Sequence, residues 1–326
     1  MSMRGWPLIK LMPQKTNFRF VRHAKLMGGL AALLCVASII GCFYPGLNLG
    51  IDFRGGATME VSKPAGQVLQ LERVRGAVGD LGLGDVQVQG IDSESAAIIR
   101  FQIPEGQNQS EVVARVEKAI SDSVGEVTYS GVSVVGSKVS GELFRSGLYA
   151  LAAAIFLMFL YIWFRFEPQF GFGAIIGLLH DVILTFGLVV LFRFEFSLNT
   201  VAAILTVIGY SMNDTVVVFD RLRENLRKYK TMPLQDVIDL SLNETLTRTI
   251  MTGVTAVGVL AILAIFGGEA LFSFSIILML GIIIGTFSSI YVGTPIVLMW
   301  GVRRGNISRG GDDDLKPVKL GMASRP

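Results

Sequence analysis

Four ionisable side chains lie inside segments that are otherwise apolar: His180, Asp181, Asp214 and Arg248. Ionisable groups within a bilayer are costly and usually mark a function such as proton or ion transfer. An arginine partner holds a carboxylate ionised, whereas removal from water favours the protonated form. We therefore expect Asp214, with Arg248 nearby, to bind and release a proton, and we consider Asp181 a further candidate.

Asp214 belongs to a polar stripe on one helix. At about 100° per residue, four polar residues fall within an arc of about 100° on a helix rich in Val, Ile and Ala: Thr206, Tyr210, Asn213 and Asp214. Tyr210 and Asn213 could simply bond neighbouring helices, but a carboxylate is a costly residue for that purpose. The next apolar segment opens with a second polar face, from which Thr249 is expected to support the site. Arg248 either pairs with Asp214 or extends its side chain to the membrane surface.

Asp181 lies about 15 Å along a helix from Gly171, which places it near the middle of a membrane. Gly173 and Gly177 precede it at a spacing that permits close helix contact. His180 points about 100° away from its neighbour, so a direct relay between His180 and Asp181 is not expected. For His180 we expect packing or a hydrogen bond to another helix.

The composition identifies a membrane protein. Of the 326 residues, 51% are hydrophobic and 17% are charged, and the mean hydropathy is +0.56. Soluble domains carry about 25% charged residues, so a cytosolic enzyme, a nucleic-acid-binding protein and a disordered scaffold are excluded. A membrane-spanning helix needs about 20 apolar residues, and six segments qualify. They are 26–44, 143–164, 170–191, 198–219, 250–266 and 271–300, the last with an expected kink at Pro295.

The basic residues predict the orientation. Lys and Arg concentrate in the N-terminal arm, in the connection 221–230 and in the tail, and short cytoplasmic loops hold such residues. Both termini are therefore expected in the cytoplasm, with the acidic segment between the first two spans outside. The predicted division is a cytoplasmic arm (1–25), a first transmembrane helix (26–45), a periplasmic α+β domain (46–142), a five-helix transmembrane bundle (143–302) and a flexible cytoplasmic tail (303–326).

The first span has a rival interpretation as a signal peptide. The residues 39–42 resemble a lipoprotein cleavage site ending in Cys42, but a basic region of 25 residues is long for a signal peptide. We therefore expect an uncleaved helix. The other cysteine, Cys35, lies about 10 Å away along that helix, too far for a disulfide with Cys42.

The exported segment alternates between strand and helix patterns. We expect strands at 57–62, 86–91, 96–103 and 126–135, and helices at 67–78 and 109–123, with a turn at 92–94. The order β-α-β-β-α-β is typical of a ferredoxin-like domain. The segment contains no His or Cys, so we expect a rigid binding or spacing module that moves on hinges at Gly55–Gly56 and within 136–147. A less favoured alternative is strand addition of extended polypeptide to an open edge.

Four segments together carry a family resemblance: 49–56, 177–182, 209–221 and 241–249. In this order and topology the chain resembles the SecF family of bacterial Sec translocase subunits, which is similar to the RND transporter superfamily. Within the first segment, Asp52, Arg54, Gly55 and Gly56 match a hallmark of the family that is structural and not a reaction site. The resemblance also implies that Asp214 and Arg248 belong to a proton path.

The resemblance further implies a polytopic α-helical inner-membrane protein with six transmembrane helices, the RND-like half that pairs with SecD. Its implied function is to use the proton motive force to assist late stages of preprotein translocation through SecYEG, with YajC and YidC as associated proteins. Protons are then the coupling ion, without another cofactor, a metal, a nucleic-acid partner or an enzymatic reaction.

Two alternatives are weighed against this function. An RND small-molecule efflux half would carry a much larger external insertion than residues 46–141. An intramembrane aspartyl protease could use Asp181 and Asp214 as a pair, but such proteases carry Gly-x-Gly-Asp, and neither aspartate follows that pattern.

Overall fold

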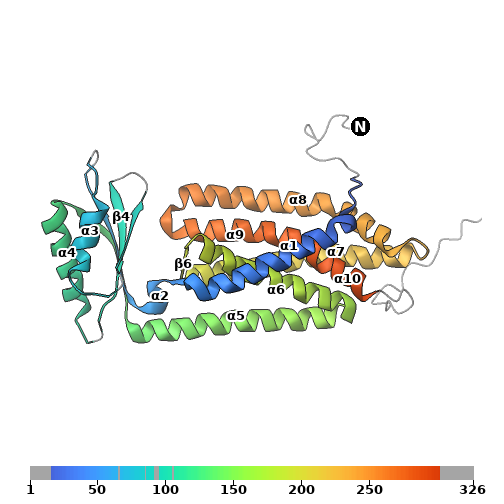
Figure 1. Ribbon diagram of the computed structural model, residues 1–326, viewed down its shortest axis with the longest axis horizontal. Helices are drawn as coiled ribbons and strands as arrows, with labels where there is room; N and C mark the ends of the chain where they lie inside the picture. The colour runs from blue at the N-terminus through green and yellow to red at the C-terminus, as the bar shows by residue number, and fades with distance from the viewer. Residues whose placement is uncertain (1–15, 65–66, 85, 92–94, 105, 302–326) are drawn as a thin grey trace, which may run out of the picture.

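The computed structural model describes residues 16–301 apart from 65–66, 85, 92–94 and 105. Long helices run side by side in a bundle, and a small sheet domain lies at one end of it (Figure 1). The described residues contain six helices that are long and apolar enough to cross a membrane, as expected from the sequence. The predicted turn at 92–94, the predicted tail at 303–326 and residues 1–15 of the arm lie outside the described residues.

Most of the spanning helices extend beyond the apolar segments that predicted them. They are α1 (Phe20–Gly41), α5 (Ser137–Arg165), α6 (Pro168–Leu191), α7 (Leu198–Lys228), α8 (Leu234–Phe266) and α9 (Gly268–Ser288), which continues through a π-helical turn, η2 (Ser289–Gly293), into α10 (Thr294–Trp300). A second π-helical turn, η1 (Cys42–Gly46), follows α1. The π-helical turn η2 lies directly before the helical turn that contains Pro295, where a kink was expected; proline lacks an N–H and cannot donate to the carbonyl group of Tyr291 one turn earlier.

The sheet domain has the predicted order of elements. They are β2 (Gly56–Ser62), α3 (Leu71–Gly79), β3 (Gln87–Ile91), β4 (Ala96–Phe101), α4 (Gln109–Val124) and β5 (Thr128–Val135). The sheet is antiparallel with the strand order β3-β4-β2-β5, which is the ferredoxin-like arrangement. Both helices cover the face of the sheet that points away from the bundle (Figure 1).

A short junction joins the domain to the bundle. It consists of β1 (Asn48–Leu49), α2 (Ile51–Arg54) and β6 (Glu195–Phe196), with β1 and β6 paired in parallel. The Asp52 carboxylate accepts the backbone N–H of Leu198 at 2.9 Å and so caps the first turn of α7. Gly55 and Gly56 have φ of 75° and 133°, and a Cβ at Gly56 would overlap the carbonyl oxygen of Phe101. These residues therefore set the path of the chain into β2; their structural role in the family motif and the hinge at Gly55–Gly56 stay predictions.

The domain rests on the junction through an ion pair. Arg100 of β4 lies 2.7 Å from Glu195 of β6, and both side chains are largely buried.

The second predicted hinge is shorter than expected. Gly136 precedes α5 in an extended conformation, but Gly141 and Gly147 lie inside this helix. Its hydrogen bonds hold both glycines, so the prediction of hinges at these two positions is wrong.

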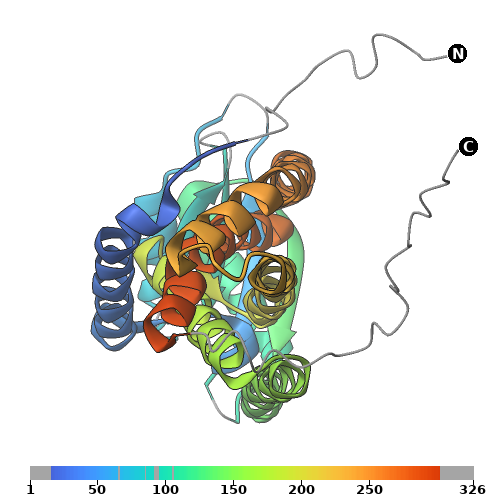
Figure 2. The ribbon, with the colours of Figure 1, turned by 90° about the vertical axis from the view of Figure 1, so that its right-hand side faces the viewer.

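Helices α6, α7 and α9 form the centre of the bundle. Viewed from the end opposite the sheet domain, α1 and α5 lie at its edge (Figure 2). About half of the most apolar stretch of α6 and of α7 is buried, against 6% in α1. Helix α9 approaches α7 closely at Gly285, where a Cβ would lie 2.8 Å from the Cβ of Ser211. Small residues at such contacts let polar groups of facing helices meet.

Candidate functional site

Asp181 lies at the centre of the bundle and is fully buried, with 0% of its surface exposed. The hydroxyl groups of Ser211 on α7 and Ser288 on α9 both donate to Oδ2, the latter at 2.8 Å, and His180 Nδ1 lies 2.9 Å from Oδ1. The backbone carbonyl of Asp181 also accepts from Thr185 at 2.7 Å. One carboxylate therefore ties three central helices together.

Asp214 lies one turn after Ser211 on α7 and is 6% exposed. The hydroxyl group of Thr249 on α8 donates to Oδ1 at 2.7 Å, as the sequence-based supporting role of Thr249 requires. The hydroxyl group of Ser289 lies 3.4 Å from Oδ2, but the carbonyl oxygen of Thr286 is nearer to it at 3.0 Å. The Asp214 carboxylate therefore has one strong hydrogen bond and one weak contact.

A pair of adjacent serines connects the two carboxylates. Ser288 is the last residue of α9 and contacts Asp181, and Ser289 is the first residue of η2 and contacts Asp214. Regular α-helix would place adjacent side chains about 100° apart, so such a pair can face two different neighbours. π-Helical turns inside helices are often found at functional sites. A change at one carboxylate therefore acts on a serine that is adjacent in sequence to the serine that contacts the other carboxylate.

The expected ion pair between Asp214 and Arg248 is not formed in this structure. Thr249 occupies the position against Asp214, and the Arg248 side chain is exposed. The physical reason is the 100° rotation per residue, since α8 can present only one of two adjacent residues to α7. Among the described residues, Arg248 forms no ion pair.

A direct contact between His180 and Asp181 is present, contrary to the sequence-based expectation. Adjacent side chains leave the helix in different directions, but the side-chain rotamers of both residues bring Nδ1 of His180 within 2.9 Å of Oδ1 of Asp181. The other ring nitrogen, Nε2, is buried and forms no hydrogen bond with a described residue. The ring stacks on Phe287 at 6.3 Å between centroids.

The predicted polar stripe on α7 divides into a buried and an exposed part. Asp214 faces the bundle, whereas Thr206 and Asn213 are exposed and the hydroxyl group of Tyr210 forms no hydrogen bond with a described residue. Asn213 lines a groove of about 540 Å³ beside α5, and Tyr210 lines a groove of about 420 Å³ beside α8 and α9. The exposed edge of α7 therefore carries two exposed polar residues, Thr206 and Asn213, each of which lines one of the two grooves.

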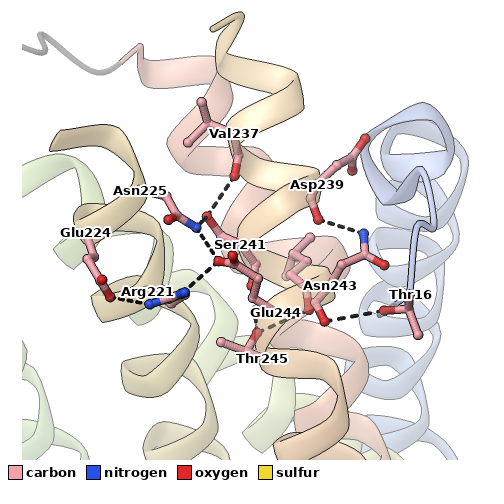
Figure 3. Close-up of polar contacts among 11 residues, drawn as sticks. Thr16, Arg221, Glu224, Asn225, Val237, Asp239, Ser241, Asn243, Glu244 and Thr245 are labelled. Atoms are coloured by element: carbon pink, nitrogen blue, oxygen red, sulfur yellow. Dashed lines mark hydrogen bonds and ion pairs between the residues drawn. The ribbon is translucent and has the colours of Figure 1, made fainter. Parts of the chain in front are cut away.

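At the end of the bundle opposite the sheet domain, α7 and α8 are clamped by charged and amide groups (Figure 3). Arg221 of α7 lies 2.7 Å from Glu244 of α8 and 2.5 Å from Glu224. The amide of Asn225 donates to Glu244 at 2.6 Å and to Ser241 at 3.0 Å. This clamp lies beyond Asp214 and Thr249 on the same two helices and restricts how they can separate.

The same part of α8 holds the start of the chain that the structure describes (Figure 3). The side chain of Asn243 accepts the N–H of Phe18 at 2.9 Å and donates to its carbonyl oxygen at 2.8 Å. Asp239 accepts the N–H of Val21 at 2.9 Å, so a residue of α8 satisfies the first turn of α1. The segment 239–249 of α8 therefore contacts α7, the residues that precede α1, and the first turn of α1.

The sequence analysis missed the serines that hold the carboxylates: Ser211, Ser288 and Ser289. Serine is common at helix contacts, and nothing in the local pattern distinguishes these three from other small residues. The one available signal was the pair at 288–289, which precedes Pro295 and interrupts an apolar run.

The described residues do not supply a metal site. No group of three or more His, Cys, Asp or Glu side chains comes together in the described part of the chain. The side chains around Asp181 and Asp214 are hydroxyls and one imidazole, which suit the binding and transfer of protons.

Comparisons with known proteins identify the family of the chain. A family profile described as "Protein export membrane protein SecD/SecF, C-terminal" matches residues 115–303, and one described as "SecD/SecF GG Motif" matches residues 45–62. The chain is 44% identical to protein translocase subunit SecF of Cereibacter sphaeroides, covering 91% of this chain and 94% of that one. It is 40% identical to protein translocase subunit SecF of Rickettsia akari, covering 93% and 98%.

The fold is also similar to solved structures. The crystal structure of SecDF, a translocon-associated membrane protein from Thermus thermophilus, matches with a TM-score of 0.79 at 29% identity, over 89% of this chain and 39% of that chain. A structure of SecDF in a super-membrane-facing form matches with a TM-score of 0.63 at 28% identity. The chain therefore spans about two fifths of the length of the SecDF chains.

Proposed function

Because the chain belongs to the SecD/SecF family of protein export membrane proteins, we propose that it acts as the SecF subunit of the Sec translocase. In this role it uses the proton gradient, together with SecD, to assist late stages of preprotein translocation across the inner membrane. The SecYEG channel, YajC and YidC are part of the same proposal as the wider assembly. Protons are the coupling ion.

One observation supports proton coupling most directly. Asp181 and Asp214 are buried in the centre of the bundle, and neither forms an ion pair with a Lys or Arg among the described residues. Hydroxyl groups stabilise a carboxylate but do not neutralise its charge, and an uncompensated charge away from water is costly. Binding a proton removes that charge, so the bundle is suited to two states that differ by a proton.

The energy available is sufficient for a conformational change. One proton that crosses 100 mV supplies about 2.3 kcal/mol, which shifts a two-state equilibrium about fifty-fold. Asp214 is the proposed coupling residue because its contacts to Thr249 and Ser289 join α7 to α8 and to η2. Arg248 is proposed to pair with Asp214 in a second arrangement of α7 and α8.

SecD is the proposed cover for the exposed edge of α7. Thr206 on this edge already donates to the carbonyl oxygen of Ala202 at 2.8 Å, but hydrocarbon cannot satisfy the donor and acceptor atoms of the exposed Asn213 amide, which lines the groove beside α5. Helices of a partner that is itself a six-helix half would satisfy them. Recovery of an active chain from its native membrane without a second multispanning protein would contradict this partner.

The orientation with both termini in the cytoplasm belongs to the proposal as well. Arg221, Arg223 and Arg227 lie at the end of the bundle opposite the sheet domain, where α1 also begins with Arg19 and Arg22. Short cytoplasmic segments hold such basic residues, so the sheet domain faces the periplasm.

The test measures export into inner-membrane vesicles with and without a proton gradient. Asp214→Asn keeps the size of the side chain but cannot bind and release a proton. The gradient-dependent part of export should be lost, while the ATP-driven part survives. Asn213→Asp on the adjacent exposed position is a control for charge alone. A normal gradient response of Asp214→Asn would show that Asp214 serves packing and that this site is wrongly assigned.

A further inference from the structure

A large cavity opens beside α1 at the end of the bundle opposite the sheet domain. Its volume is about 1130 Å³, and its walls come from α1, α6, the first turn of α8, η2 and α10. Charged side chains line its mouth: Arg19, Arg22, Lys25, Asp236 and Asp239. Along α1 the lining extends from Arg22 to Cys35, which is about 20 Å and therefore reaches the middle of a membrane.

His180 lines the inner part of this cavity, together with Cys35 of α1 and Tyr291 of η2. It follows the first residue of α6 by twelve positions, or about 18 Å from the same end of the bundle. The side chain is only 5% exposed and lines the cavity, and its Nε2 forms no hydrogen bond with a described residue. An imidazole nitrogen at such a depth is costly to leave unpaired unless it has a partner for part of the time.

The opposite side of the same ring contacts the carboxylate network. Nδ1 lies 2.9 Å from Asp181, which accepts from Ser288, and the adjacent Ser289 contacts Asp214. His180 thus lies between the cavity and a chain of hydrogen-bonding groups that leads to Asp214. Of the cavity-lining residues, His180 is the one that bonds to either buried carboxylate.

We propose that His180 transfers protons between the carboxyl group of Asp181 and water in this cavity, which makes the cavity the aqueous end of the proton path opposite the sheet domain. The inference rests on the proposed proton coupling and adds to it a residue and a route. It concerns a proton-transfer group and involves no bound ligand other than water and the proton.

The transfer balances in protons and charge. The Asp181 carboxyl group gives its proton to Nδ1, and Nε2–H gives a proton to water, so the ring passes through imidazolium and ends neutral. The step leaves a carboxylate at Asp181 and the Nδ1–H tautomer of the ring; the reverse steps, in which water gives a proton to Nε2 and Nδ1–H gives its proton to the carboxylate, restore the starting arrangement. The groups that face this ring are Asp181 on its own helix, Cys35 on α1 and Tyr291 on η2, with the five charged residues at the mouth farther away.

The covered position of the His180 ring also prevents a continuous leak of protons through the bundle. Nε2 is covered in this structure, and Phe287 stacks on the imidazole. Contact with water therefore requires the ring or Phe287 to move. Coupled transport needs such a gate, because a continuous path would dissipate the gradient without work.

The first experiment asks whether the cavity holds water, and it uses the chain's own cysteines. Cys42→Ser leaves Cys35, which lines the cavity, and Cys35→Ser leaves Cys42, which does not. A charged methanethiosulfonate reagent, which needs a hydrated thiolate, should label Cys35 when added on the side opposite the sheet domain. Labelling of Cys35 by a lipid-soluble maleimide alone would mean that acyl chains fill the cavity, and would overturn the inference.

The second experiment measures gradient-driven proton uptake and export with His180→Ala. Both should fall by about 100-fold, as after removal of a positioned acid–base group, and added imidazole should restore them in a concentration-dependent manner. If His180→Ala does not fold, His180→Asn takes its place in the test. His180→Asn keeps a polar group toward Asp181 and should be equally defective. A structural role predicts that His180→Asn is active and that imidazole has no effect.

Comparison of the His180 variants with Asp214→Asn separates the proton-transfer role of His180 from the proposed function. If Asp214→Asn loses the gradient response while His180→Ala and His180→Asn keep it, the proton-transfer role of His180 is wrong and the proposed function stands. If Asp214→Asn keeps the response, Asp214 is not the coupling residue; if export by the unchanged chain does not respond to the gradient, the proposed function itself fails.

Discussion

The two buried carboxylates differ in how firmly their surroundings hold them. Asp181 is fully buried, with donors from Ser211 and Ser288 and a contact to His180. Asp214 has one strong hydrogen bond, from Thr249, and its other neighbour is 3.4 Å away. Both lie in the same bundle and are linked by adjacent serines, so the difference comes from local packing and not from depth alone.

This difference suggests different roles. A carboxylate with several donors from different helices stabilises one arrangement of those helices, because each donor loses its partner when the helices separate. A carboxylate with one strong bond can exchange that bond for another at a smaller cost. Asp181 is therefore suited to anchor the bundle and exchange a proton in place, and Asp214 is suited to change partners during the cycle.

The largest expected effect in this comparison is on the stability of the bundle with Asp181→Asn. The amide accepts through one oxygen only, and its NH2 group faces hydroxyls that previously donated to a carboxylate. The free energy of unfolding should fall by about 2 kcal/mol, against less than about 1 kcal/mol for Asp214→Asn. Thermal unfolding of both variants in the same detergent measures this difference. Equal losses would remove the distinction between an anchor and an exchangeable site.

A smaller effect is expected from the serine pair, where each variant serves as the control of the other. The hydroxyl group of Ser288 lies nearer to Asp181 (2.8 Å) than to the carbonyl oxygen of Gly285. The hydroxyl group of Ser289, in contrast, lies nearer to the carbonyl oxygen of Thr286 than to Asp214. Ser288→Ala should lower the unfolding free energy by about 1 kcal/mol and Ser289→Ala by about half as much. The reverse order, measured by thermal unfolding, would contradict the assignment of the stronger contact to Asp181.

The smallest effect on stability is expected at Arg248. Its side chain is exposed, so Arg248→Lys should change the free energy of unfolding by no more than about 0.5 kcal/mol. Lysine keeps the charge but loses the planar fork of donors, so a partial loss of gradient-dependent export is expected if Arg248 pairs with Asp214 during the cycle. A stability loss as large as that of Asp181→Asn, or unchanged export, would exclude that temporary pairing.

Much of the fold could be predicted from the sequence because hydropathy and periodicity are local properties. Six apolar runs of sufficient length predicted the six spans, and alternating patterns predicted the ferredoxin-like order of the sheet domain. The helix ends were less accurate, since a helix continues past its apolar part wherever polar residues favour helix. The structure therefore extends α5 over two glycines that the sequence suggested as hinges.

The sequence by itself also identified Asp181 and Asp214 as buried ionisable groups, because charges within apolar runs are visible without a structure. Only the tertiary structure decided their partners. Thr249 faces Asp214 in place of Arg248, and Ser288 and Ser289 reach two different carboxylates. Helical periodicity gives the direction of a side chain on its own helix, but not the rotation and depth at which another helix, far along the chain, packs against it.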